Sequence, residues 1–287
     1  MKAEDVRRVG VIGCGVMGSG IVEVCARAGM EVVYLEASQD LVDRGRALIE
    51  ASTLHAIERG RLSDADRDGV LGRTRGTTTL EDLGGSDLVL EAATEDYGTK
   101  RELFRRLDEV LPPEVILGSN TSSIPIADLG AVTRRPDKVI GMHFFNPVPV
   151  MGLIELVRSI TTAEETVEFG RAFGVIVGKT TVESRDRAGF IVNMLLIPYL
   201  NSAVRMLEEG FATREDIDTA IHLGLNHPMG PLRLIDLIGL DTTMFVANVL
   251  YEEFKEPLYA PPPLLKRMVT AGHLGRKSGR GFYEYEE

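Results

Sequence analysis

Short runs of β-branched and aliphatic residues alternate with stretches of helical periodicity over the first two thirds of the chain. The apolar runs between Val9 and Val182 are VGVI, VVYL, LVLEAA, VILGS, KVIGMHFF, LIELV and VIVGKTTV. Strands that alternate with helices indicate a mostly parallel sheet with helices on both faces. The clearest helix is the first, which ends at Gly29. Its apolar positions at helical spacing are Ile21, Val24, Cys25 and Ala28.

The strand pattern ends near Gly189, and the rest of the chain is helical. Ile191 to Glu209 has the length and apolar spacing of one long helix. Thr213 and Asp216 form a capping-box start for the next helix. Further helices are expected around residues 241–253 and 262–271. We therefore expect two domains, an α/β domain over residues 1–185 and an all-α domain over residues 186–287, divided near the polar stretch VESRDRAG.

One segment of the α/β domain is too long for a single crossover between strands. Between Leu41 and Thr77 the helical pattern continues past Gly60, where we expect the chain to turn. The segment is therefore expected to form a helical hairpin that is inserted into the domain and could cover a substrate.

A glycine-rich segment, VIGCGVMGSG, lies between the first expected strand and the first expected helix. Gly13 permits a tight turn, Gly15 lets the backbone approach a pyrophosphate, and Gly18 lets the helix pack closely on the strand. Free N–H groups at the start of the helix, where Val16 and Met17 lie, would hold the phosphates. A Rossmann-type nucleotide-binding domain is therefore expected, although such a turn also occurs without a ligand.

The second strand ends in Glu36, at the distance where an acidic residue holds the adenine ribose. Its carboxylate accepts hydrogen bonds from ribose hydroxyls and repels an added 2′-phosphate, which favours NAD over NADP. Arg44 and Arg46 lie downstream and keep NADP open, because either side chain could turn toward a phosphate.

Composition narrows the class of partner. The chain has 287 residues, 26% of them charged, and a formal net charge of −11, which disfavours a nucleic-acid partner. No apolar run approaches the roughly 18 residues of a membrane span. The first strand begins too early to leave room for a signal peptide, so we expect a cytoplasmic protein. Cys14 and Cys25 are too far apart along one helix to form a disulfide, and no metal-ligand spacing occurs.

Three polar clusters follow the glycine-rich segment: SNTSS, HFFNPVPVMGLIE and GFIVN. Two of them follow expected strands, whose carboxyl ends face the ligand in open α/β sheets. His143 could shuttle a proton, and Glu155 could orient its imidazole ring. Simpler readings stay open: His143 could be structural, Ser123 could cap a helix and leave Ser122 for a ligand, and Asn193 could be solvated or a cap.

These segments resemble the 3-hydroxyacyl-CoA dehydrogenases, most closely the short-chain 3-hydroxybutyryl-CoA branch. The resemblance covers essentially the whole chain and includes VIGCGVMGSGI, SNTSSIPI, GMHFFNPVPVM, GFIVN, HPMGPLRLIDLIGLDT and GRKSGRGFY. It implies a homodimer through the helical domain, the L form of the hydroxyl, and His143 as acid/base with Glu155 as its orienting partner. It also implies that Ser122 and Asn193 bind the reacting oxygen. The implied cofactor contacts are Glu95, Lys100, Ser122, Asn146 and Lys277.

The match departs from the family in the hairpin, where relatives gather lysines against the CoA phosphates. Ser52 and Arg59 stand at the matching contact positions, but Glu50 and Glu58 dilute the charge, so weaker CoA binding or a smaller carrier is an alternative. Gly152 stands where many relatives carry lysine. Two other functions stay open: a sugar-acid dehydrogenase of the gulonate type, and a non-catalytic NAD-binding protein with the same fold.

Overall fold

The computed structural model describes residues 2–285 of the chain. The chain divides into two compact units, Met1–Arg187 and Ala188–Glu287, where the sequence placed the division between residues 185 and 186. The first unit is α/β and the second is helical, in agreement with the expected fold class. Short 3-10 helices occur at Ala3–Asp5, Leu80–Leu83, Pro136–Lys138 and Arg276–Ser278.

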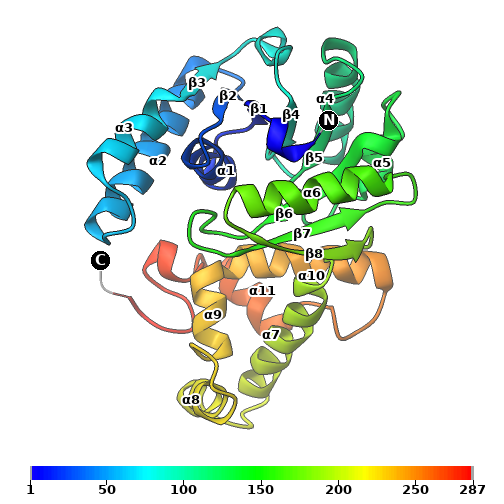
Figure 1. The fold of residues 1–287 in the computed structure, drawn as a ribbon. Helices are drawn as coiled ribbons and strands as arrows, with labels where there is room; N and C mark the ends of the chain where they lie inside the picture. Colours follow the sequence, from blue (N-terminus) through cyan, green and yellow to red (C-terminus); the bar gives the residue numbers. More distant parts are fainter. Residues whose placement is uncertain (1, 286–287) are drawn as a thin grey trace. The chain divides into compact units, whose positions relative to one another are not determined.

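The first unit is built on one eight-stranded sheet with the strand order β3-β2-β1-β4-β5-β6-β7-β8 (Figure 1). Every pair of neighbouring strands is parallel except β6 and β7, which are antiparallel. The strands are β1 (Arg8–Ile12), β2 (Glu31–Leu35), β3 (Thr74–Thr77), β4 (Leu88–Glu91), β5 (Ile116–Ser119), β6 (Val139–Phe144), β7 (Leu153–Arg158) and β8 (Thr180–Arg185).

The strand order explains where the helices lie. From β1 the chain moves one way through β2 to β3, and from β4 it moves the other way through β5 to β6. Because parallel crossovers are right-handed, these two halves place their helices on opposite faces. The order reverses between β1 and β4, and ligands bind beside the carboxyl ends of strands at such a reversal. The helices of this unit are α1 (Val16–Arg27), α2 (Gln39–Glu58), α3 (Asp64–Gly72), α4 (Tyr97–Val110), α5 (Ile126–Gly130) and α6 (Glu164–Ile176).

The segment between β2 and the next strand contains the expected helical hairpin. Helices α2 and α3 pack on one another, and the chain turns at Gly60, which has a φ of 66°. The expectation that this segment is helical up to Thr77 is wrong at its end, because Thr74–Thr77 forms β3 at the edge of the sheet. The sequence TRGT gave no strand signal, since only its threonines favour a strand.

A second boundary also differs from the expectation. The run VIVGKTTV was read as one strand, yet Val175 and Ile176 complete helix α6, and the strand starts only at Thr180. Gly178 makes the turn between the two elements with a φ of 73°. The strand β8 is largely exposed, so it lacks the apolar pattern that would have located it.

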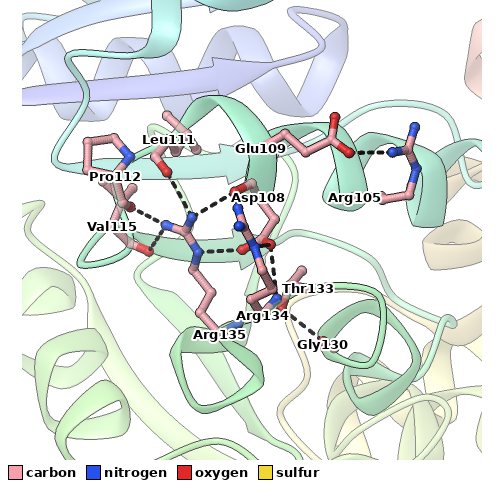
Figure 2. A network of polar contacts seen from close by, with 10 residues as sticks. All are labelled: Arg105, Asp108, Glu109, Leu111, Pro112, Val115, Gly130, Thr133, Arg134 and Arg135. Carbon is pink, nitrogen blue, oxygen red and sulfur yellow. Dashed lines mark hydrogen bonds and ion pairs between the residues drawn. The ribbon is translucent and has the colours of Figure 1, made fainter.

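The carboxyl end of helix α4 is closed by a buried arginine (Figure 2). Arg135 donates from Nη2 to the carbonyls of Asp108 and Leu111 at 3.1 and 2.8 Å, and from Nη1 to the carbonyl of Pro112. Its Nε donates to the Asp108 carboxylate at 2.8 Å, and Arg134 donates to the other oxygen of that carboxylate at 2.8 Å. One guanidinium therefore gives a partner to the Asp108 carbonyl in the last turn of the helix and to the carbonyls of the two residues that follow it.

The second unit consists of five helices among the described residues. They are α7 (Val192–Glu208), α8 (Arg214–Gly224), α9 (Pro231–Ile238), α10 (Leu240–Phe254) and α11 (Pro263–Thr270). The Thr213 side chain accepts a hydrogen bond from the Asp216 N–H, as the capping pattern predicted. Helix α9, which starts at a proline, was not anticipated. Within residues 2–285 no single helix is a candidate membrane span; α9 and α10 pass that test only together, with a bend of 97° between them.

Candidate active site

The glycine-rich segment forms the turn from β1 into α1. Gly13 has a φ of 84°, and a Cβ there would lie 2.7 Å from the Ala92 carbonyl oxygen. At Gly18 a Cβ would lie 1.7 Å from the carbonyl oxygen of Gly13, so helix and loop approach too closely for any other residue. At Gly15 a Cβ would meet nothing within 4 Å, and no side chain caps the helix that starts after it. The helix N–H groups thus border open space, as a bound pyrophosphate requires.

Glu36 follows β2 and reaches this loop. Its Oε1 accepts a hydrogen bond from the Cys14 N–H at 2.5 Å. Burial, and then the charge of Glu36, raise the pKa of the Cys14 thiol to about 12, so this thiol stays protonated at neutral pH. Cys14 precedes α1 and Cys25 lies within it, and both are free and buried thiols, so the assumption that both lie on the helix was wrong. The carboxylate of Glu36 is therefore fixed beside the glycine loop.

His143 and Glu155 face each other across the one antiparallel step of the sheet. They are paired in the register of β6 and β7, and His143 Nδ1 lies 2.8 Å from Glu155 Oε2. Glu155 is fully buried and His143 nearly so. Because a carboxylate only accepts, Nδ1 carries the hydrogen, and Nε2 is the basic nitrogen of the neutral ring. The strand ladder therefore fixes both the position and the tautomer of the imidazole.

The SNTSS loop after β5 is held by Glu95. One oxygen, Oε1, accepts from Thr121 Oγ1 at 2.5 Å, from the Ser122 N–H at 3.0 Å and from Ser123 Oγ at 2.7 Å. Burial opposes ionisation of Glu95, but the Lys100 ammonium and these hydrogen bonds outweigh it and hold the pKa below its ordinary value. Glu95 is thus a carboxylate that fixes the backbone around Ser122.

Lys100 lies beneath this loop, with only 1% of its surface exposed. Its Nζ is 3.2 Å from Glu95 Oε2 and 2.5 Å from Oε1 of Glu91, the last residue of β4. The other oxygen of Glu91 accepts from Ser119 Oγ at 2.6 Å. Sequence reasoning missed Glu91. Its signal was a glutamate inside the apolar strand LVLE, where a buried charge requires partners.

Asn120 is a second residue that sequence reasoning missed. Its Oδ1 accepts from the Phe144 N–H at 2.8 Å, directly after His143 on β6. Its own N–H donates to the carbonyl of Glu91 at 2.7 Å. The structure therefore links the loop that carries Ser122 to the strand that carries His143, and both to the end of β4.

The alternative that Ser123 caps a helix is wrong. Helix α5 starts at Ile126 with Pro125 before it, and no side chain of its own segment caps it. Instead, the Asp186 carboxylate accepts from the N–H groups of Ile126 and Ala127, both at 2.8 Å. A cap contributed from 60 positions away cannot be read from a local sequence pattern.

The remaining expected residues lie on several elements. Asn146 is exposed in the turn between β6 and β7, Ser52 lies half-buried on α2, and Arg59 is exposed at the end of that helix. Asn193 is the second residue of α7, and Lys277 forms an ion pair with Asp241 at 2.6 Å; both belong to the second unit. Residues 2–285 contain no group of three His, Cys, Asp or Glu residues able to hold a metal ion.

Comparison with known proteins gives a consistent result for both units. Residues 8–187 match the family "3-hydroxyacyl-CoA dehydrogenase, NAD binding domain", and residues 189–285 match "3-hydroxyacyl-CoA dehydrogenase, C-terminal domain". The 3-hydroxybutyryl-CoA dehydrogenase of Mycobacterium tuberculosis is 53% identical over 285 residues, 99% of this chain and 100% of the relative.

Two solved structures share the fold. The crystal structure of M. tuberculosis FadB2 has a TM-score of 0.96 at 53% identity and covers 98% of this chain and 99% of its own. That of (S)-3-hydroxybutyryl-CoA dehydrogenase PaaH1 from Ralstonia eutropha has a TM-score of 0.93 at 45% identity, covering 99% and 100%. With a family model matching each of the two units, the chain belongs to the 3-hydroxyacyl-CoA dehydrogenase family.

Proposed function

We propose that the protein interconverts (L)-3-hydroxybutyryl-CoA and acetoacetyl-CoA with NAD, with His143 as general acid/base. The observation that carries the proposal is the pair formed by His143 Nδ1 and Glu155 Oε2 at 2.8 Å, in a sheet that also carries the dinucleotide loop. The names of the relatives support a four-carbon acyl-CoA as substrate.

The proposed chemistry is a proton transfer coupled to a hydride transfer. The nicotinamide, when bound, accepts or supplies the hydride at C3 of the acyl group. His143 Nε2 takes the proton of the 3-hydroxyl group, or returns it when the ketone is reduced. Glu155 keeps Nδ1 protonated and stabilises the ring when it becomes charged. Ser122 and Asn193 are assigned to the reacting oxygen, where a well-placed donor contributes about 3–4 kcal/mol to the transition state.

Glu95 and Asn146 are assigned to the nicotinamide half of the cofactor, and Lys277 to a weaker contact. For Lys100 the burial and the two carboxylate partners favour an indirect role, in which it holds Glu95. Gly13, Gly15, Gly18 and the N–H groups of Val16 and Met17 are assigned to the pyrophosphate.

NAD is proposed over NADP because of the charges around the adenine ribose. Glu36 would place a carboxylate where a 2′-phosphate would lie. Arg46 donates to Glu50 at 2.8 Å and to the Leu71 carbonyl and Thr74 at 3.0 Å, so turning toward a phosphate would break three hydrogen bonds. Only Arg44, exposed on α2, remains as a basic alternative.

The CoA phosphates are assigned to Ser52 and Arg59. Of the two acidic residues that dilute the charge of the hairpin, Glu50 pairs with Arg46, while Glu58 contacts His55, which is charged only when it is protonated. Arg59 is exposed at the end of α2, where a phosphate can reach it. A large rise in the KM for acetoacetyl-CoA in Arg59→Ala would support the contact, and an unchanged KM would remove it.

A homodimer through the second unit is part of the proposal. Large apolar side chains are exposed on that unit, with exposed fractions of 60–75%: Leu195, Phe211, Leu223 and Leu225. A dimer contact through this unit would cover side chains of this kind. Sedimentation at micromolar concentration should give twice the mass of 31.4 kDa.

Two free thiols and a net charge of −11 support a cytoplasmic protein without a nucleic-acid partner, and we propose no membrane partner.

The test follows NADH absorbance with acetoacetyl-CoA, beside NADPH and beside gulonate with NAD. Rapid oxidation of NADH, but not of NADPH, in the presence of acetoacetyl-CoA would support both the proposed substrate and the proposed cofactor. Activity only with gulonate and NAD would make the protein a sugar-acid dehydrogenase. His143→Gln should abolish turnover and leave NADH affinity nearly unchanged. Full turnover in that variant would end the proposal for His143.

A further inference from the structure

The turn between β6 and β7 contains carbonyl groups that its own backbone does not satisfy. Pro147 and Pro149 have no N–H to donate. The N–H groups of Val150 and Met151 both donate to the Pro147 carbonyl at 2.9 Å. The carbonyl oxygens of Val148 and Met151 instead accept from Lys179 Nζ at 2.6 and 2.7 Å. One ammonium group therefore bridges the two sides of the turn.

Lys179 is placed by its own backbone for this contact. It follows Gly178 in the turn from α6 to β8, and its N–H donates to the Gly174 carbonyl at 2.8 Å. The next N–H, of Thr180, donates to the carbonyl of Gly152 at 2.8 Å and so ties the strand to the end of the same turn. The lysine side chain is buried, although lysine almost never is.

The charge of Lys179 has no carboxylate of its own among residues 2–285. Glu23 on α1 is paired with Arg27 at 2.5 Å, and no ion pair joins it to Lys179. Burial lowers the pKa of Lys179, the Arg27 charge lowers it further, and Glu23 only partly opposes them. The ammonium group is thus stabilised by the carbonyl dipoles of the turn, and the turn by the ammonium.

The turn also packs on the helix that follows the glycine loop. A Cβ on Gly20 of α1 would lie 2.7 Å from Cβ of Val148 and 3.2 Å from Cδ of Pro149, so only glycine permits this approach. Val148 is buried in the contact, while Asn146 at the start of the turn is exposed. The position of Asn146 relative to the dinucleotide loop therefore depends on how the turn is held.

We propose that Lys179 is a positioning residue for the cofactor: its ammonium group holds the 146–151 turn against α1 and so presents Asn146. It contacts neither cofactor nor substrate itself. The inference rests on the proposed function, because Asn146 is a cofactor contact only in a nicotinamide-dependent enzyme. His143 and Glu155 are held by the strand ladder instead, so the proposal concerns cofactor affinity more than the chemical step.

The experiment measures NADH binding by fluorescence titration in the absence of any acyl-CoA. Lys179→Met keeps the length of the side chain and removes its charge and donors. We expect its Kd for NADH to rise about tenfold, which corresponds to about 1.4 kcal/mol. At saturating NADH, kcat should change less than about threefold, unlike a general loss of structure, which would lower both. Lys138→Met is the matched control, because Lys138 also donates to a carbonyl, that of Pro113 at 2.9 Å, but is exposed.

A double-mutant cycle decides whether Lys179 acts through the turn. If it does, the double variant with Lys179→Met and Asn146→Ala should have a Kd for NADH no higher than that of the single variant with the higher Kd. Fully additive losses, or a Kd unchanged in Lys179→Met, would overturn the proposal. Lys179→Gln keeps an N–H donor and should fall between wild type and Met; it serves if the Met variant does not fold. Failure of the wild type to bind NADH would instead refute the proposed function.

Discussion

The two ends of helix α4 carry buried ion networks of similar composition and different consequence. At the carboxyl end, Asp108 and Arg135 close the helix and contact backbone carbonyls (Figure 2). At the amino end, Lys100 joins Glu91 to Glu95, and the Glu95 oxygen that does not face Lys100 holds the loop that carries Ser122. The first network contacts only structural parts of the fold, whereas the second contacts a loop of the candidate active site.

The difference shows that burial and charge alone do not identify a functional network. Both networks contain an acidic residue whose pKa is held low, and both include a basic side chain of 5% exposure or less. The two networks differ in the groups that they hold, which are backbone carbonyls at the end of α4 in the first and the loop that carries Ser122 in the second. Removing the first should change stability without changing catalysis per folded molecule, whereas removing the second should also change catalysis per folded molecule.

The largest effect is expected from Arg135→Met. The change removes the donor to one oxygen of the Asp108 carboxylate and the donors to the carbonyls of Leu111 and Pro112, while Arg134 still contacts the other carboxylate oxygen. Breaking one half of a buried ion pair costs about 3–5 kcal/mol of unfolding free energy. Urea unfolding measures the loss, and kcat per folded molecule should stay at the wild-type value.

Arg134→Met is the matched control for that prediction. Arg134 donates to the same carboxylate, but its side chain is 78% exposed, where that of Arg135 is 5% exposed. Water replaces the lost bonds of an exposed side chain, so the loss of stability should be much smaller. Equal losses in the two variants would show that burial is not the cause.

Glu95→Gln should have the next largest effect, on catalysis. The amide keeps the shape of the side chain but loses the charge that binds the hydroxyl and N–H groups of the SNTSS loop. We expect kcat/KM with acetoacetyl-CoA to fall about tenfold, or about 1.4 kcal/mol. Glu102→Gln, on the exposed face of α4, should leave kcat/KM unchanged. A large loss of stability in Glu95→Gln with normal kinetics would remove the distinction between the two networks.

A smaller effect is expected on the pH dependence of stability. The pKa values of Glu95 and Asp108 both lie below their ordinary values of 4.5 and 3.8, because the neighbouring basic side chains and hydrogen-bond donors outweigh burial. Between the lowered pKa and the ordinary one, the unfolded state binds more protons than the folded state, so the unfolding free energy rises with pH in that range. The contribution is complete above the ordinary pKa and is lost as the pH falls through the lowered one. Urea unfolding between about pH 5 and about pH 3 should show a shallower slope for Glu95→Gln than for wild type.

The smallest effect is expected from removing Arg105, which lies on the exposed face of α4 near its middle. Arg105 pairs with Glu102 and Glu109 on the exposed face, between the two networks (Figure 2 shows the second pair). Exposed ion pairs contribute little because water and salt screen them. Arg105→Ala should leave both the unfolding midpoint and kcat/KM at wild-type values. A clear change in either would mean that surface charge couples the ends of α4.

The sequence predicted those parts of the fold that depend on local patterns. The glycine loop, the capping of α8 by Thr213 and the helical hairpin all have short-range signals, and the structure contains each of them. Strand β3 and helix α9 were missed because an edge strand without apolar alternation, and a short helix after a proline, have little local signal.

The sequence predicted which residues form the candidate site, but not the hydrogen bonds and ion pairs that connect them. His143 and Glu155 were placed by their strands, and their register makes them neighbours. The roles of Glu91, Asn120 and Asp186 depend on partners 9 to 60 positions away. Such pairings are set by the order of strands in the sheet, which no single stretch of sequence specifies.

The single antiparallel step of the sheet also has a consequence for how the chain folds. His143 and Glu155 are 12 positions apart, and the whole 143–155 segment forms one hairpin, whereas the glycine loop must wait for β4 to pair with β1. Closing a short loop loses little chain entropy and occurs early. Both residues of this pair lie in the first unit, so the pair can form without the 188–287 unit.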